Sequence, residues 1–258
     1  MNAMGCVSLV LFIEETRRSQ FVYTRGPLKP VGVGSQLTTL NLSSSAVVSL
    51  PIWFNTFVRL KWLFLKDCKQ LQEIPELPPS VEMVYLVGCT SLERLPFNNI
   101  YNSPMLEWID LSDCPERIRN DLQIHLVSEG HPQGHRFGCI FPGNKIPDYL
   151  SHGKEVSNTK SHEIDINEPM HLDSENTRFV FFAVIGTEDV QDEASFQIWK
   201  VINNVSHCSY DICISSGSDH VWLHYLGLHH SQVEADNIRL TFKCVDEFGN
   251  PSKERVVS

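Results

Sequence analysis

The chain has 258 residues, of which 42% are hydrophobic and 20% charged, a composition typical of a globular protein with a sizeable core. Its 31 acidic and 21 basic side chains give a formal net charge of −10, which argues against a dedicated nucleic-acid or anionic-membrane surface, because such surfaces need clustered Lys and Arg. Residues 136–258 carry 10 basic and 18 acidic side chains, so the excess of acid lies mostly in the second half and indicates a change of domain near residue 135.

Residues 1–36 form a poorly defined N-terminal segment that we interpret as a strand or partial repeat. The apolar run at residues 4–13 lacks a basic flank and a small-residue cleavage site. It is also far shorter than the roughly 20 residues needed to cross a bilayer. We therefore expect neither a signal peptide nor a transmembrane helix.

Residues 37–114 repeat one spacing of apolar side chains four times. Each set reads L-x-x-L-x-L, with a serine or cysteine three positions further on. The sets start about 21 to 25 residues apart, the period of leucine-rich repeats. The four sets are Leu37, Leu40, Leu42 and Ser45; Leu60, Leu63, Leu65 and Cys68; Val81, Val84, Leu86 and Cys89; and Leu106, Ile109, Leu111 and Cys114.

This spacing predicts short strands whose leucines turn inward while the alternating residues face a concave surface. Stacking the units in register gives one column of Thr39, Trp62, Met83 and Trp108, and a second of Asn41, Phe64, Tyr85 and Asp110. Exposed apolar side chains in such rows mark contact sites. The predicted ligand-binding residues are Trp62, Phe64, Met83, Tyr85 and Trp108. The alternative is permanent cover by another domain or chain.

A change of period follows Cys114. Pro115 precedes Ile118, Leu122 and Leu126, which are spaced as one face of a helix. Such a helix closes the end of a solenoid, so we assign residues 37–129 to the repeats with a capping helix. Residues 130–135, rich in Gly and His, are read as a linker.

Residues 136–258 have the pattern of strands. Alternating or continuous apolar runs occur at residues 161–166, 179–185, 196–202, 208–214, 221–226 and 238–244, separated by Gly, Ser, Asn and Asp-rich segments. This order predicts an antiparallel β-sandwich. The fold class we expect is a short α/β leucine-rich-repeat solenoid of about four repeats followed by an all-β antiparallel sandwich.

No motif for catalysis or metal binding is present. There is no phosphate loop, nucleophile elbow, kinase motif or C-x-x-C pair in the sequence. His220 and His224 lie in a β-favouring run, where their attachment points are about 13 Å apart, too far to share an ion. We expect surface or half-buried histidines there, no catalytic residue, no metal and no cofactor. The regular cysteine spacing indicates reduced thiols and an intracellular protein.

Residues 60–75 and 81–96 follow the form L-x-x-L-x-L-x-x-C-x-x-L-x-x-L/I-P. This form resembles the repeats of plant intracellular immune receptors of the TIR, nucleotide-binding, leucine-rich-repeat class. Residues 139–152, 218–225 and 237–244 look like successive motifs of the domain that follows the repeats in those receptors, the C-JID domain, a jelly-roll and immunoglobulin-like sandwich. The motif residues are Phe141, Pro142, Gly143, Ile146, Pro147, His220 and Trp222.

The resemblance implies a non-catalytic recognition module for a pathogen effector protein, in the cytoplasm with the nucleus as a second location. Further partners would be the rest of a receptor or another receptor chain, with no nucleic acid and no membrane. The family's NAD-cleaving TIR domain and its nucleotide-binding domain have no counterpart here, so the chain reads as a receptor's truncated tail. We also expect the last strand of the sandwich, near residues 256–258, to be missing. Two alternatives stay open: a carbohydrate-binding sandwich of a secreted repeat receptor, and a non-functional receptor remnant.

Overall fold

The structure is a computed structural model that divides into two compact units, residues 1–137 and 138–258. It describes residues 11–13, 22–24, 37–96, 100, 103, 105–118, 136–145, 161–166, 178–186, 194–202, 205–214, 219–227, 238–246 and 255–257. The predicted linker at residues 130–135, the motif residues Ile146 and Pro147, and the helix positions Leu122 and Leu126 lie outside these ranges. The two units are described separately below.

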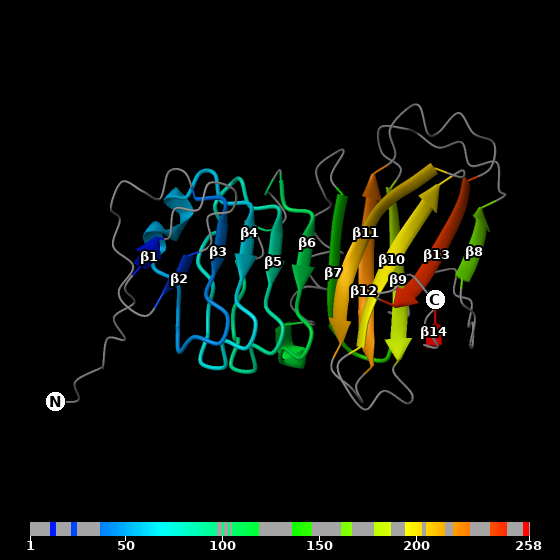
Figure 1. Ribbon diagram of the computed structural model, residues 1–258. Helices are drawn as coiled ribbons and strands as arrows, with labels where there is room; N and C mark the ends of the chain where they lie inside the picture. The colour runs from blue at the N-terminus through cyan, green and yellow to red at the C-terminus, as the bar shows by residue number, and fades with distance from the viewer. Residues whose placement is uncertain are drawn as a thin grey trace. The chain divides into compact units, whose positions relative to one another are not determined.

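In the first unit, four short strands pair in parallel, in chain order (Figure 1). Their central residues, Leu40, Leu63, Val84 and Ile109, are all buried, as are the apolar residues that flank each strand. Because no single repeat can cover its own leucines, stacking the four repeats side by side buries them. The strands are β3 (Thr39–Asn41), β4 (Trp62–Phe64), β5 (Met83–Tyr85) and β6 (Trp108–Asp110).

Each strand is followed by a tight turn in which one residue adopts a left-handed conformation. These residues have φ values of 58° (Ser44), 56° (Asp67), 70° (Gly88) and 60° (Asp113). Each stands directly before the serine or cysteine of its unit. Ser, Asp and Gly are residue types that form turns or tolerate this region, so the spacing repeated along this chain has a backbone reason.

Each turn is held by a backbone hydrogen bond to the next repeat of the sequence. The N–H groups of Ser44, Asp67 and Gly88 donate to the carbonyl oxygens of Lys66, Val87 and Ser112 at 2.7 to 2.9 Å. Two isolated parallel β-bridges also join neighbouring repeats, one between Ser49 and Glu73 and one between Glu73 and Arg94.

The segments around the parallel strands differ in how regular they are. Strands β1 (Leu11–Ile13) and β2 (Val22–Thr24) form an antiparallel pair. After β3 a 3₁₀ helix, η2 (Ile52–Thr56), starts behind Pro51 and buries Phe54. Residues 116–118 are helical where the capping helix is predicted to begin, and Ile118 is buried there.

In the second unit, strands lie at all six positions where the apolar runs predict them, and their pairings given residue by residue are antiparallel. One sheet has the order β11-β10-β13-β8, and in the other β14, β9, β12 and β7 are consecutive neighbours. The strands are β7 (Arg136–Pro142), β8 (Ser161–Ile166), β9 (Arg178–Gly186), β10 (Ala194–Ile202), β11 (Val205–Ile214), β12 (His220–Gly227), β13 (Ile238–Asp246) and β14 (Arg255–Val257).

The last described strand, β14, has three residues and lies where the resemblance places the start of the last strand of the sandwich. Its Val256 pairs with Ile185 of β9 in an antiparallel register. Within the described residues, no helix has the length and apolar character needed to span a bilayer.

Candidate functional site

The strand register brings four of the five predicted ligand-binding residues together. Trp62 of β4 pairs with Met83 of β5, and Phe64 pairs with Tyr85. Their side chains alternate with the buried Leu63 and Val84 and therefore share the opposite side of the sheet. We call Trp62, Phe64, Met83 and Tyr85 the open face.

The open face is partly accessible to solvent. Trp62 is 42% exposed, and the other three side chains are half-buried. The rings of Phe64 and Tyr85 stack with centroids 4.8 Å apart and planes 5° from parallel. The Tyr85 hydroxyl donates a hydrogen bond to the Met83 sulfur, 3.4 Å away. These contacts hold three side chains in place beside Trp62.

Trp108, the fifth predicted residue, lies in the same row but is buried, with 1% of its surface exposed. We expected it to contribute to an accessible surface, and that expectation is wrong. All three residues of β6 are buried, so both sides of this strand are covered. Thr39, in the first strand of the same row, is buried as well. The accessible part of the two columns is therefore narrower than the sequence predicts and centres on β4 and β5.

Asp110 occupies the second column next to Tyr85 and is also buried. Its Oδ1 accepts a hydrogen bond from the Ser112 backbone N–H at 3.0 Å. Burial raises the pKa of Asp110 to about 6, against the opposing effect of hydrogen bonding from Ser112. In the first of the four repeats the same position holds Asn41, whose Oδ1 accepts a hydrogen bond from the Ser43 N–H at 2.9 Å. The carboxylate thus performs a turn-forming role that a neutral amide performs elsewhere.

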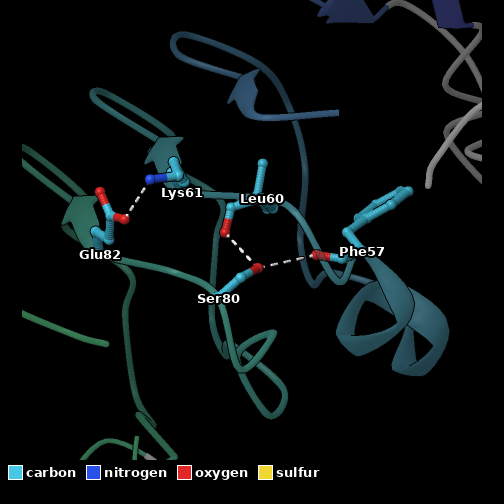
Figure 2. A network of polar contacts seen from close by, with 5 residues as sticks. All are labelled: Phe57, Leu60, Lys61, Ser80 and Glu82. Atoms are coloured by element: carbon cyan, nitrogen blue, oxygen red, sulfur yellow. Dashed lines mark hydrogen bonds and ion pairs between the residues drawn. The ribbon is translucent and has the colours of Figure 1, made fainter. Parts of the chain in front are cut away.

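A row of charged side chains borders the open face at the starts of the strands. The Lys61 ammonium forms an ion pair with Glu82 at 2.6 Å (Figure 2). Glu107 is exposed and follows Glu82 in the row, its N–H donating to the Glu82 carbonyl at 2.8 Å. We call Lys61, Glu82 and Glu107 the margin row. The sequence reasoning missed it, although all three residues directly precede a strand residue of the first column.

Backbone hydrogen bonding explains why the margin row turns outward. The Lys61 carbonyl accepts from both Glu82 N–H (2.8 Å) and Met83 N–H (3.0 Å), and the Glu82 carbonyl accepts in the same way from Glu107 and Trp108. Two consecutive donors on one acceptor interrupt the regular alternation of the strand. Nearby, the Ser80 hydroxyl donates to the Leu60 carbonyl at 2.8 Å, with the Phe57 carbonyl 3.4 Å away (Figure 2).

The repeat cysteines lie on the inner side, away from the open face. The thiols of Cys68, Cys89 and Cys114 donate to the carbonyl oxygens of Leu42, Leu65 and Leu86, one unit earlier, at 3.1 to 3.2 Å. All three are free and buried. Burial raises the pKa of all three thiols, that of Cys89 to about 12, so they are poor nucleophiles and metal ligands. Their role is structural.

The motif residues of the second unit are mostly buried where they are described. Phe141 and Trp222 are enclosed, while Pro142 and Gly143 are half-buried at the end of β7. His220 and His224 are fully buried, so our expectation of surface or half-buried histidines is wrong. Five consecutive residues of β12, from 220 to 224, are buried, which means that both sides of this strand are covered. The His224 ring stacks on Trp222, two residues earlier on the same side, at 5.6 Å.

The described residues contain no group of three or more His, Cys, Asp or Glu side chains placed to hold a metal ion. The feature with the clearest chemistry is therefore the open face with its margin row, which can make stacking, apolar and charge contacts with a ligand.

No protein-family model matches the chain. Curated proteins do match it. Disease resistance protein RPS4 from Arabidopsis thaliana is 26% identical over 182 residues, covering 60% of this chain and 14% of that protein. Disease resistance-like protein CSA1 from the same plant is 25% identical over 122 residues, 40% of this chain and 10% of its own length.

A third relative has higher identity over a shorter region. Probable disease resistance protein RPP1 from Arabidopsis thaliana is 38% identical over 118 residues, covering 45% of this chain and 9% of the relative. The matched regions thus span about a seventh of these relatives or less. The chain is a homologue of plant disease resistance proteins.

Proposed function

We propose that this chain acts in plant defence as a non-catalytic protein-recognition module of an intracellular immune receptor, binding a pathogen effector protein through the open face. In this proposal residues 37–129 are a short leucine-rich-repeat solenoid and residues 136–258 a jelly-roll or immunoglobulin-like sandwich of the C-JID type. In the same proposal the chain has no catalytic activity, lies in the cytoplasm, and corresponds to the C-terminal part of a longer receptor protein.

The observation that carries the proposal is the accessible aromatic surface on a regular parallel sheet. Trp62 remains 42% exposed, although the central apolar residues of all four strands, Leu40, Leu63, Val84 and Ile109, are buried. Aromatic side chains held in place by neighbours are the residues that contribute most to protein–protein binding. The homology to disease resistance proteins favours a pathogen effector protein as the ligand.

The parallel register also supports the solenoid part of the proposal. Residues 39, 62, 83 and 108 align across four strands although 21 to 25 residues separate neighbours along the chain. A repeating unit of about that length is the period of a leucine-rich repeat.

The test is a binding assay between the purified full chain and candidate effector proteins of plant pathogens. Trp62→Ala and Tyr85→Ala should each weaken capture of a bound effector by about thirtyfold or more, because truncating a central aromatic anchor typically costs about 2 kcal/mol or more. Val58→Ala is the matched control, since Val58 is a 58% exposed apolar residue outside the open face. An effector captured equally by the wild type and both aromatic variants would remove the open face from the proposal.

A further inference from the structure

Trp62 is the side chain of the open face with the freest aromatic surface. The stack of Phe64 on Tyr85 uses one face of each of those rings, and Met83 is engaged by the Tyr85 hydroxyl. Trp62 keeps 42% of its surface accessible and lies two residues from Phe64 on the same side of β4. The face of an indole ring carries negative potential, and Trp is the best aromatic partner for a cation.

The margin row beside Trp62 has an excess of negative charge. Lys61 is neutralised by Glu82, whose side chain is 21% exposed, and the pair leaves one oxygen of Glu82 uninvolved. Glu107 is exposed and has no ion-pair partner among the described residues. The three side chains therefore carry one uncompensated negative charge, in a chain whose formal net charge is −10.

We propose that the open face takes an arginine side chain projecting from the surface of the protein partner, with its guanidinium over Trp62 and paired with Glu107 and with the oxygen of Glu82 that Lys61 does not contact. The proposal rests on the proposed function and names the chemistry of the group that the site recognises. Strands β4 and β6 are about 10 Å apart at a spacing of about 4.8 Å per strand, a gap that a glutamate side chain and a guanidinium together span.

Arginine fits this arrangement better than lysine for two reasons. Its planar guanidinium stacks on an aromatic ring, and its fork of N–H donors binds two carboxylate oxygens at once. It is also less strongly hydrated than an ammonium group, so transfer to a partly apolar surface costs less.

The experiment uses the ¹⁵N-labelled full chain and two small probes. N-acetyl-Gly-Arg-Gly-amide carries the guanidinium, while the same peptide with citrulline has nearly the same shape without the charge. The indole N–H signal of Trp62, assigned by its loss in Trp62→Phe, reports binding. We expect a saturable shift with the arginine peptide in the millimolar range and at least about fivefold weaker binding of the citrulline peptide.

Two margin-row variants should change the affinity for the arginine peptide in opposite directions. Glu107→Gln should weaken binding of the arginine peptide about two- to fivefold, because it removes the uncompensated carboxylate. Lys61→Gln should strengthen it by a similar factor, because it removes a like charge and releases Glu82. Both side chains are exposed, so the remaining amide signals should be unchanged and serve as the folding control.

Three outcomes would overturn the proposal: equal response to both peptides, no saturable shift with either, or a change of the same sign in both margin-row variants. Titration with cellohexaose is the comparison for a sugar ligand, and a Trp62 shift there but not with the arginine peptide would assign the face to carbohydrate. If Trp62→Ala abolishes effector capture while the arginine peptide fails, the proposed function stands and only the arginine assignment is lost.

Discussion

The thiol of Cys89 donates a hydrogen bond to the carbonyl oxygen of Leu65, 3.1 Å away and one unit earlier in the sheet. The same contact joins Cys68 to Leu42 and Cys114 to Leu86. Each thiol thus gives a buried carbonyl of the preceding repeat a second donor, beside the backbone N–H three residues further along that repeat, which donates at 3.1 to 3.2 Å. The cysteine row is a set of links between units rather than a set of reactive groups.

Replacing Cys89 with alanine should destabilise the chain by about 1–2 kcal/mol, because the Leu65 carbonyl loses one of its two donors, keeping the Cys68 N–H at 3.2 Å, and a small void remains. Urea unfolding followed by circular dichroism measures the change. Cys89→Ser is the control, since it keeps a hydroxyl donor and since Ser45 occupies the equivalent position in the first unit. A serine variant that is as unstable as the alanine variant would argue against the hydrogen bond as the cause.

The repeat thiols should resist alkylation in the folded protein. Burial raises the pKa of Cys89 to about 12 and that of Cys114 well above its ordinary value, so at pH 8 almost no thiolate is available. Iodoacetamide at pH 8 should leave Cys68, Cys89 and Cys114 unmodified over an hour and modify all three in 8 M urea. Peptide mass spectrometry reads the extent at each site, and rapid modification of Cys89 without urea would contradict its burial.

Asp110→Asn should stabilise the chain at neutral pH. The folded-state pKa of Asp110, about 6, lies above its ordinary value of 3.8, so the burial cost is absent below pH 3.8, grows as the pH rises to 6 and is complete above that. A shift of this size corresponds to roughly 3 kcal/mol at pH 7.5. Asn41 shows that an amide can accept the same turn hydrogen bond.

The measurement for Asp110 is the difference in unfolding free energy between Asp110→Asn and the wild type at several pH values. The gain should be small at pH 4.5 and should level off above about pH 7. An equal gain at pH 5 and pH 7.5 would mean that ionisation of Asp110 is not its origin.

Gly88→Ala should destabilise the chain by about 1–2 kcal/mol, since a residue with a Cβ is strained at a φ of +70°. The new Cβ would also lie 2.7 Å from Oδ1 of Asp67. Differential scanning calorimetry of Gly88→Ala in the wild type and in an Asp67→Gly background separates the two causes, since glycine tolerates the φ of 56° at position 67. If backbone strain dominates, removing the Asp67 carboxylate restores only a minor part of the loss.

The sequence was most informative where one spacing repeats. Four copies of L-x-x-L-x-L define the phase of each strand, and the observed pairing of residues 39, 62, 83 and 108 follows from it. The six apolar runs after residue 160 likewise coincide with strands, because alternation is a local property of the chain.

Burial on the second side of a strand could not be predicted in the same way. Trp108 and Trp62 have the same place in the motif, yet one is buried and the other is 42% exposed. His220 and His224 alternate with apolar residues and so resemble solvent-facing positions, but β12 is covered on both sides. What covers a strand is contributed by distant segments, and the local pattern contains no information about them.

The strands begin at residues 39, 62, 83 and 108, so the segments between them differ in length while the nine-residue motif does not. Each thiol hydrogen bond, and each carbonyl that accepts from two consecutive N–H groups, joins two adjacent repeats. Duplication or loss of one complete unit would therefore leave the backbone frame intact and change only which side chains stand on the open face. Such a scaffold can exchange its contact residues by recombination without first being redesigned, whereas a single residue inserted inside the motif would turn every following side chain of that strand to the wrong side.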